Sequence, residues 1–342
     1  MGRGELEYRK LGASGIEVSA LGLGVMTFGG QTPEEDAMRQ MDMALDAGVT
    51  LFDTAENYPT PTGPETQGRS EEILGKWVKS RGVRDRVVIA TKVAGPGNAA
   101  GDMSHIRGAH RRLDRANIRE AVECSLRRLG VEYIDLYQPH WPERAMTTLW
   151  RSRFALLPDD PVQVPIEETF AALAELVDEG KVRAIGVSNE SPWGLMRYVA
   201  LAQQGRGPRL ASLQIGYSLL DRQPEIGHAE VLMREGIGML GYSPLARGLL
   251  TGKHLDGSNH PMLTPGRRAA VEAYVALARQ AGLDPAHMAL AYAAGKPFMT
   301  SVLMAASSAA QLRHNIAAAG LTLPKDISKA IDAIHDANAN PR

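Results

Sequence analysis

The chain has 342 residues, and its 38 Lys plus Arg against 39 Asp plus Glu give a formal net charge of −1. This balance excludes the strongly basic composition that a general electrostatic contact with nucleic acid or an anionic membrane requires. The single cysteine, Cys124, excludes an intramolecular disulfide framework and favours a reducing compartment. The first residues lack the apolar segment of a signal peptide, and no apolar run of about 18 residues occurs. We therefore expect a cytoplasmic protein without a membrane span.

Short runs of β-branched and aliphatic residues recur along the chain, separated by longer segments with helical periodicity. Most of these runs lack strict alternation, as expected for parallel strands covered on both faces. Ser191-Pro192 is typical of a helix start, and Gly130 and Gly236 are typical of helix ends. Successive β-then-α units without a dividing linker predict one (β/α)₈ barrel domain, of the TIM-barrel fold class, over residues 1–342. The eight predicted strands are residues 20–23, 50–52, 87–91, 134–137, 182–187, 212–215, 237–240 and 301–303.

Two further segments lie outside this repeat, and two connections within it are unusually long. Residues 7–19 resemble a small hairpin that could plug the floor of the barrel, and residues 324–337 predict a C-terminal helix. Two long connections, residues 94–114 and 140–165, follow the third and fourth strands. Loops longer than about 15 residues in a compact domain are usually functional or disordered. Active sites of such barrels lie at the C-terminal strand ends, so both loops are expected at the site.

Chemically useful side chains stand at three successive strand ends: Asp53 and Tyr58, then Lys92, then His140. A free tyrosine has a pKa of about 10, and a neighbouring ammonium is expected to lower it. Asp53 would keep Lys92 charged, and a neutral His140 would hydrogen-bond a substrate oxygen. Each residue alone has a structural explanation, as a helix cap, a surface group or a packed side chain. Together they predict a general acid that protonates a developing alkoxide, as carbonyl reduction requires.

Other familiar motifs are absent or incomplete. The run from Gly22 to Thr27 lacks the third glycine of the dinucleotide-binding fingerprint, and Glu190 replaces the last glycine of a hydrolase elbow. No phosphate-binding P-loop occurs. With one cysteine and nine scattered histidines, we expect no metal site.

The chain resembles the aldo-keto reductase superfamily over almost its whole length. The runs 58–69 and 190–198 are similar to a bacterial NADP(H)-dependent branch of it. The resemblance implies that Tyr58 is the proton donor, that Lys92 and Asp53 tune it, and that His140 orients the carbonyl. The matching segments are residues 48–58, 89–92, 133–141, 180–189 and 241–253.

The same resemblance implies that an extended NADP(H) cofactor lies across the later strand ends. Tyr242 would stack on the nicotinamide ring, and the loop that follows it would contact the pyrophosphate. The chain departs from its relatives at Ala305, where glycine is common, and at Ser307-Ser308, where threonines often stand. The implied cofactor residues are Met26, Asp53, Ser188, Asn189, Gln214, Tyr242, Ser243, Pro244, Leu245, Ala246, Gly248, Leu249, Lys253, Ser307, Gln311 and Asn315.

The expected partner is a small carbonyl compound, an aldehyde or ketone contacted by Tyr58, His140 and Trp141, and a homo-oligomer is possible. An alternative is a regulatory NADPH-binding protein with slow turnover, since the four residues also resemble the β subunits of voltage-gated potassium channels. The sequence has no basic docking arm to favour that alternative. A third candidate is a barrel isomerase that uses the four residues without nicotinamide.

Overall fold

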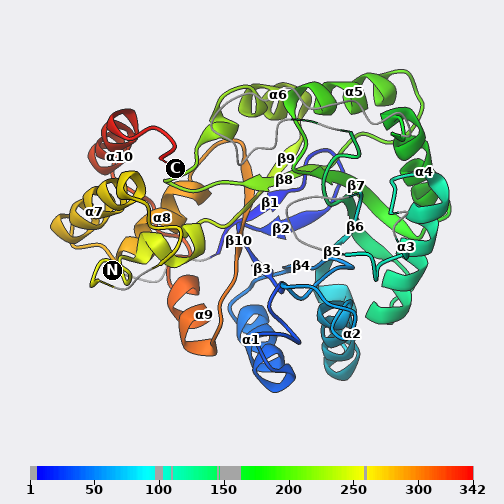
Figure 1. Cartoon of the computed structure of the whole chain (residues 1–342), viewed down its shortest axis with the longest axis horizontal. Helices are drawn as coiled ribbons and strands as arrows, with labels where there is room; N and C mark the ends of the chain where they lie inside the picture. The colour runs from blue at the N-terminus through cyan, green and yellow to red at the C-terminus, as the bar shows by residue number, and fades with distance from the viewer. Residues whose placement is uncertain are drawn as a thin grey trace.

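The computed structural model describes residues 6–96, 103–108, 111–144, 146, 163–257 and 260–341. Within them, eight parallel strands form a closed barrel, each paired with the next along the chain and the last paired with the first (Figure 1). This confirms the predicted (β/α)₈ barrel. The barrel strands are β3 (Leu21–Gly24), β4 (Leu51–Asp53), β5 (Val88–Val93), β6 (Ile134–Pro139), β7 (Val182–Ser188), β8 (Ser212–Gly216), β9 (Gly238–Tyr242) and β10 (Met299–Met304).

Each predicted strand is confirmed, with bounds that differ by one or two residues. The observed strands mostly extend further at their C-terminal ends, to Asp53, Val93 and Pro139 for example. These ends carry polar residues or proline, which a search for apolar runs does not include. The extension places chemically active side chains on the barrel rim.

The helices surround the ring of strands, and α7 and α10 pack together outside α8 (Figure 1). Ser191 caps α5 by accepting a hydrogen bond from the backbone N–H of Gly194, and Gly130 and Gly236 end α3 and α6 with a positive φ of 63°. The helices are α1 (Glu34–Asp46), α2 (Arg69–Arg81), α3 (Arg115–Leu129), α4 (Ile166–Asp178), α5 (Pro192–Gln203), α6 (His228–Glu235), α7 (Pro265–Gln280), α8 (Pro285–Ala294), α9 (Ala309–Ile316) and α10 (Lys325–Ala337).

An antiparallel hairpin of β1 (Tyr8–Lys10) and β2 (Glu17–Ser19) precedes the barrel. Its buried residues Leu11, Ile16 and Val18 join the apolar cluster that fills the barrel interior. The predicted floor plug is therefore confirmed, and α10 confirms the predicted C-terminal helix.

The two long connections lie partly outside the described residues. Of the first, residues 97–102 and 109–110 are not described, and of the second, residues 145 and 147–162 are not. Their described parts meet at the ends of β5 and β6, where Met103 and Ile106 pack against Ala94 and Trp141 in a small apolar cluster. Both connections therefore border the C-terminal mouth of the barrel, as expected.

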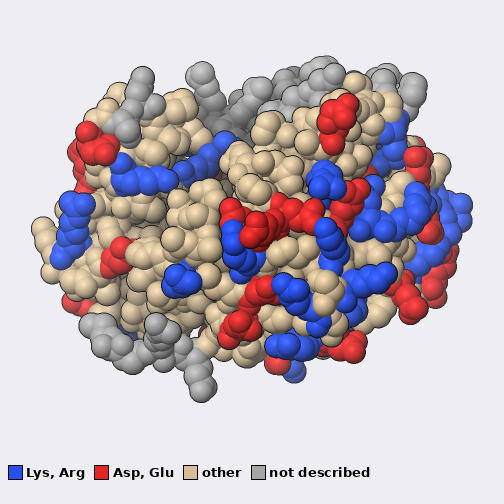
Figure 2. Space-filling view, turned by 90° about the horizontal axis from the view of Figure 1, so that it is seen from below, with Lys and Arg blue, Asp and Glu red and all other residues tan. Residues whose placement is uncertain are grey.

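Acidic and basic side chains are interleaved on the face shown in Figure 2, in keeping with a net charge near zero. Arg119, for example, pairs with both Glu175 and Glu179. In the described part of the chain, none of the helices combines the length and apolar character needed to cross a bilayer.

Candidate active site

A cleft of about 890 Å³ opens at the C-terminal ends of the barrel strands. A volume of this size suits a large organic ligand or cofactor. Three of the four predicted catalytic residues, Asp53, Tyr58 and His140, line it. The predicted cofactor and substrate residues that also line it are Met26, Trp141, Ser188, Asn189, Gln214, Tyr242, Ser243, Pro244, Leu245, Gly248, Lys253, Ser307, Gln311 and Asn315.

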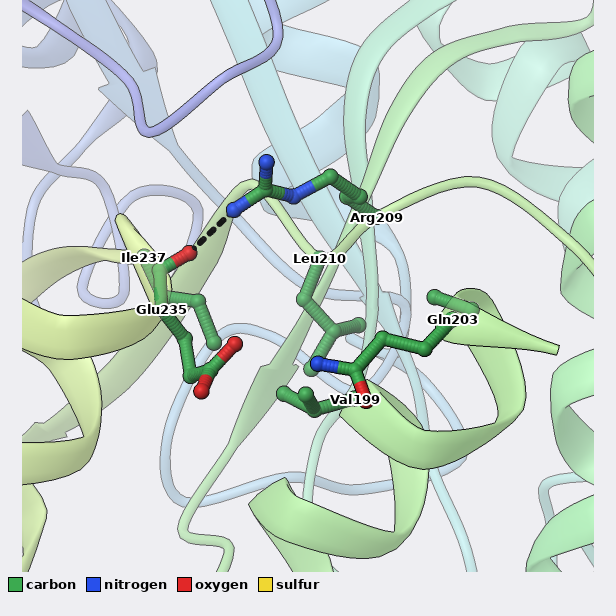
Figure 3. A pocket seen from close by; sticks show the side chains of 7 residues that line it. Val199, Gln203, Arg209, Leu210, Glu235 and Ile237 are labelled. Carbon is green, nitrogen blue, oxygen red and sulfur yellow. Dashed lines mark hydrogen bonds between the residues drawn. The ribbon is translucent and has the colours of Figure 1, made fainter. Parts of the chain in front are cut away.

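A smaller hollow of about 260 Å³ lies near the opposite end of the barrel, beside the residues that precede β8 and β9 (Figure 3). It is lined by Val199 and Gln203 of α5 and by Glu235 at the end of α6. Arg209 donates a hydrogen bond of 2.5 Å to the backbone carbonyl of Glu235. The residues that line this hollow form no acid–base arrangement like that of the cleft, so the cleft is the candidate active site.

Lys92 is fully buried behind the cleft wall, and its ammonium donates hydrogen bonds of 2.7 Å to Asp53 Oδ2 and 2.7 Å to the backbone carbonyl of Thr54. The other carboxylate oxygen of Asp53 accepts from Gln214 Nε2 at 2.7 Å. Burial lowers the pKa of Lys92, while the charge of Asp53 acts in the opposite direction. This buried ion pair fixes Asp53 at the end of β4 and brings a cation beneath Tyr58, whose ring centroid lies 5.2 Å from Lys92 Nζ.

The hydroxyl of Tyr58 lies 3.5 Å from Nε2 of His140, so an acid and an imidazole face the same point of the cleft. Burial raises the pKa of Tyr58 well above 10.0, and the Asp53 carboxylate raises it further. The expectation that Lys92 lowers this pKa is therefore wrong for the free cleft, because burial dominates and the ammonium is paired with Asp53. Desolvation and the charge of Lys92 lower the pKa of His140 well below 6.5, so this imidazole is neutral, as expected.

The side chains of Tyr242, Asn189 and Ser188 form a connected network beside Tyr58, in which Asn189 Nδ2 donates to Ser188 Oγ at 3.2 Å. Tyr242 donates from its hydroxyl to Asn189 Oδ1 at 2.7 Å, and Asn189 Nδ2 donates to the carbonyl of His140 at 2.9 Å. Ser188 donates to the carbonyl of Gln214 at 3.0 Å. A Cβ on Gly216 would stand 3.3 Å from the Tyr242 ring, so glycine leaves room for this ring at the cleft wall. The network holds an aromatic face and amide groups in fixed positions, as a planar aromatic ligand needs.

The loop after β9 departs from ordinary backbone geometry. Ser243, Ala246 and Arg247 all have positive φ, and Gly248 follows with a φ of 88°. The backbone N–H groups of Ala246 and Gly248 close turns on the carbonyls of Ser243 and Leu245, at 2.9 Å each, and the folded loop forms part of the cleft wall. Arg247 and Lys253 add cationic side chains to the same wall.

At the far end of the cleft, Ser308 caps α9 by accepting from the N–H of Gln311, while the Ser307 hydroxyl donates to Gln311 Oε1 at 2.9 Å. Asn315 lies one turn further on the same helix and also lines the cleft. Together with the loop that carries Arg247 and Lys253 and with the Tyr242 ring, this arrangement has room for an extended dinucleotide.

Two predicted cofactor residues lie elsewhere. Leu249 is buried in the apolar cluster packed by α7 and α8, and neither it nor Ala246 lines the cleft. Both belong to the 3₁₀ segment Ala246–Thr251. A sequence match does not show which side chains of such a segment face the cleft. Trp141, predicted on the substrate side, lines the cleft with its ring centroid 4.6 Å from that of His140, and it donates to the carbonyl of Pro96 at 2.7 Å.

Two features of the site were not predicted from the sequence. Asn57 Oδ1 lies 2.9 Å from Nδ1 of His140. The buried Glu56 forms an ion pair with Arg107, which also donates to the carbonyl of Ala94 at 2.9 Å. Both residues immediately precede the proposed acid, and their position next to Tyr58 was the only available signal. Arg107 ties the described part of the first long connection to the barrel rim.

A closed (β/α)₈ barrel with a polar cleft at its C-terminal mouth is a framework of many enzymes, oxidoreductases among them. The family model described as "Aldo/keto reductase family" matches residues 20–336, and the chain belongs to this family.

Curated relatives support this assignment along the whole chain. The chain is 42% identical to "Protein tas" of Escherichia coli K12 over 98% of this chain and 99% of that protein. It is 35% identical to "Uncharacterized oxidoreductase YrpG" of Bacillus subtilis, over 96% of both chains. It is 30% identical to the "L-glyceraldehyde 3-phosphate reductase" of Escherichia coli K12, over 92% of this chain and 88% of that protein.

Proposed function

We propose that the protein reduces aldehydes or ketones to alcohols with NADPH, with Tyr58 as the general acid. The observation that carries the proposal is the pair of Tyr58 and neutral His140, whose hydroxyl and Nε2 lie 3.5 Å apart at the cleft wall. A carbonyl oxygen placed between them would meet a proton donor and a neutral imidazole at once. A bound nicotinamide cofactor supplies the hydride that reduces the carbonyl carbon.

The residues of the chain supply the rest of the chemistry. Tyr58 keeps its proton at neutral pH because its pKa is raised, and it releases that proton only to a strong base such as a developing alkoxide. The phenolate left behind lies over the ammonium of Lys92. Asp53 holds that ammonium in place. Tyr58 then regains a proton from water at the cleft mouth, which restores the enzyme.

The cofactor preference for NADPH over NADH rests on charge. Arg247 and Lys253 line the cleft, and a 2′-phosphate adds negative charge that such cations attract. Met26, Ser188, Asn189, Gln214 and Tyr242 would hold the nicotinamide half, and the residues from Ser307 to Asn315 would hold the adenosine half. A cytoplasmic location is part of the same proposal, and the single cysteine is compatible with it.

The proposal is tested by two measurements on the purified protein. Tryptophan fluorescence is titrated with NADPH and NADH, and NADPH oxidation is then followed with a panel of aldehydes and ketones. We expect quenching at micromolar NADPH, weaker binding of NADH, and turnover of at least one aldehyde. No quenching would favour a cofactor-free isomerase, and binding without oxidation across the panel would favour a regulatory role. Either result would overturn the proposed reaction.

A further inference from the structure

Three potential metal ligands meet where α8 and α9 form the far wall of the cleft. Asp284 caps α8, His287 lies in its first turn, and His314 comes from α9. One ligand atom from each of the three lies within 4.8 Å of the others. The sequence, with one cysteine and nine scattered histidines, predicts no metal site, and only the fold brings these three ligands together.

Hydrogen bonds orient two of these ligands. Asp284 Oδ1 accepts from the backbone N–H groups of Ala286 at 2.8 Å and His287 at 3.1 Å. Nε2 of His287 lies 2.7 Å from the carbonyl oxygen of His314, which can only accept. This ring nitrogen must therefore donate, which leaves Nδ1 as the ring atom of His287 available to a metal ion. A backbone carbonyl that fixes the tautomer in this way is typical of metal-binding histidines.

The third ligand completes a mixed nitrogen and oxygen set. His314 Nε2 lies 3.2 Å from Asp284 Oδ1, and its ring centroid lies 4.4 Å from that of His287. Two imidazoles and one carboxylate suit zinc and neighbouring transition metals, whereas calcium and magnesium prefer oxygen ligands. Metal bonds of about 2.0–2.2 Å bring ligand atoms to roughly 3.3–3.5 Å of one another. The half-exposed His314 ring can reach this ligand-to-ligand distance by rotating.

We propose that Asp284, His287 and His314 form a binding site for one divalent transition-metal ion of the zinc class. Asp284 and His314 line the cleft close to Gln311 and Asn315, whereas His287 does not line it. A metal ion and its water ligands at this wall occupy space that the dinucleotide needs. Metal binding therefore lowers the affinity of the cleft for NADPH, and this coupling alone rests on the proposed function.

The test uses the tag-free, full-length protein and Zn²⁺ as the probe. Isothermal titration calorimetry measures Zn²⁺ binding to the wild type and to the His287→Ala, His287→Gln and His260→Ala variants. His260 is the matched control, since its ring also lies 4.4 Å from that of another histidine, His254. We expect one Zn²⁺ per chain in the wild type and in His260→Ala, and an affinity reduced by about 10–100-fold in both His287 variants. NADPH binding without metal should be unchanged in the His287 variants.

A second titration measures the coupling. Saturating Zn²⁺ should raise the Kd of NADPH at least about fivefold in the wild type and leave it unchanged in His287→Ala. Absence of Zn²⁺ binding, or equal binding by the His287 variants and the wild type, would overturn the metal site. An NADPH Kd that Zn²⁺ does not change would overturn the coupling. Failure of the proposed function gives a different result, in which Zn²⁺ binds normally and NADPH does not bind at all.

Discussion

Asn57 Oδ1 lies 2.9 Å from His140 Nδ1, on the side of the ring opposite to Tyr58. Asn57 is buried, with 4% of its surface exposed, so the amide is the partner that sets the proton position on this neutral imidazole. With its oxygen toward the ring, the amide accepts from Nδ1–H. A half-turn of the amide presents its NH₂ group instead, which places the ring proton on Nε2. Only the second tautomer can donate to a substrate carbonyl.

In Asn57→Leu, His140 loses the partner that fixes its tautomer and ring orientation, and kcat should fall by about 10–100-fold. The Kd of NADPH should stay within about twofold, since Asn57 is not among the residues proposed to hold the cofactor. Steady-state kinetics with the best aldehyde of the panel and a fluorescence titration measure the two quantities.

Asn57→Asp separates proton placement from simple packing. A carboxylate can only accept, so it holds the neutral imidazole as the Nδ1–H tautomer, and it raises the pKa of His140 from its lowered value. Activity should be low at high pH and should recover as the pH falls, because the imidazolium carries a proton on Nε2. Asn57→Leu should show no such recovery. Identical pH profiles for the two variants would show that Asn57 acts through packing alone.

The wild-type enzyme should have a broad, flat pH profile for reduction. The pKa of His140 is held well below 6.5, so lowering the pH to that value does not protonate it. The pKa of Tyr58 is raised well above 10.0, so raising the pH to that value does not remove its proton. kcat measured between these limits should therefore stay constant. A fall in kcat near pH 9 would mean that Lys92 lowers the pKa of Tyr58 once the cofactor and substrate are bound.

The barrel and the reacting side chains could be predicted because both leave local signals. A buried parallel strand is an apolar run, and the residue that follows it lies at the mouth, so Asp53, Lys92 and His140 could be assigned to one site from their strand ends alone. The sign of the Tyr58 pKa shift could not be predicted in this way. It depends on how completely the cleft excludes water, which is a property of the packed structure.

The geometry of the loop after β9 could not be predicted from the sequence either. The match over residues 241–253 indicates a cofactor loop but does not show which side chains face the cleft. The left-handed backbone of Ala246 and Arg247 changes the direction in which the following side chains point. Arg247 therefore lines the cleft, and Leu249 packs in the core. The contacts of Asn57 with His140 and of Asp284 with His314 join residues far apart in sequence, so no spacing could reveal them.

Removing the proposed acid gives the most direct test of the mechanism. In Tyr58→Phe the ring still packs in the cleft wall, but no proton can be donated, and kcat should fall by about 10²–10⁴-fold. The affinity for NADPH should be unchanged within about twofold. NADPH oxidation and fluorescence quenching measure these effects side by side. Turnover near that of the wild type would assign the acid to another group, of which His140 is the nearest.

Removing one partner of the buried Lys92–Asp53 ion pair should lower the free energy of unfolding more than removing both charges together. Lys92→Met leaves the Asp53 carboxylate buried with only the hydrogen bond from Gln214, and it should lower the free energy of unfolding by about 3–5 kcal/mol.

The double variant Asp53→Asn/Lys92→Met contains no buried charge at this position and should recover part of that loss, while the cation beneath Tyr58 remains absent. Urea denaturation of the two variants and the wild type measures stability, and kcat measures the reaction. We expect the double variant to be more stable than Lys92→Met and to remain nearly inactive. Equal stability of the two variants would show that the unpaired carboxylate is not what destabilises Lys92→Met, and recovered activity would show that the Lys92 cation is not needed for proton donation by Tyr58.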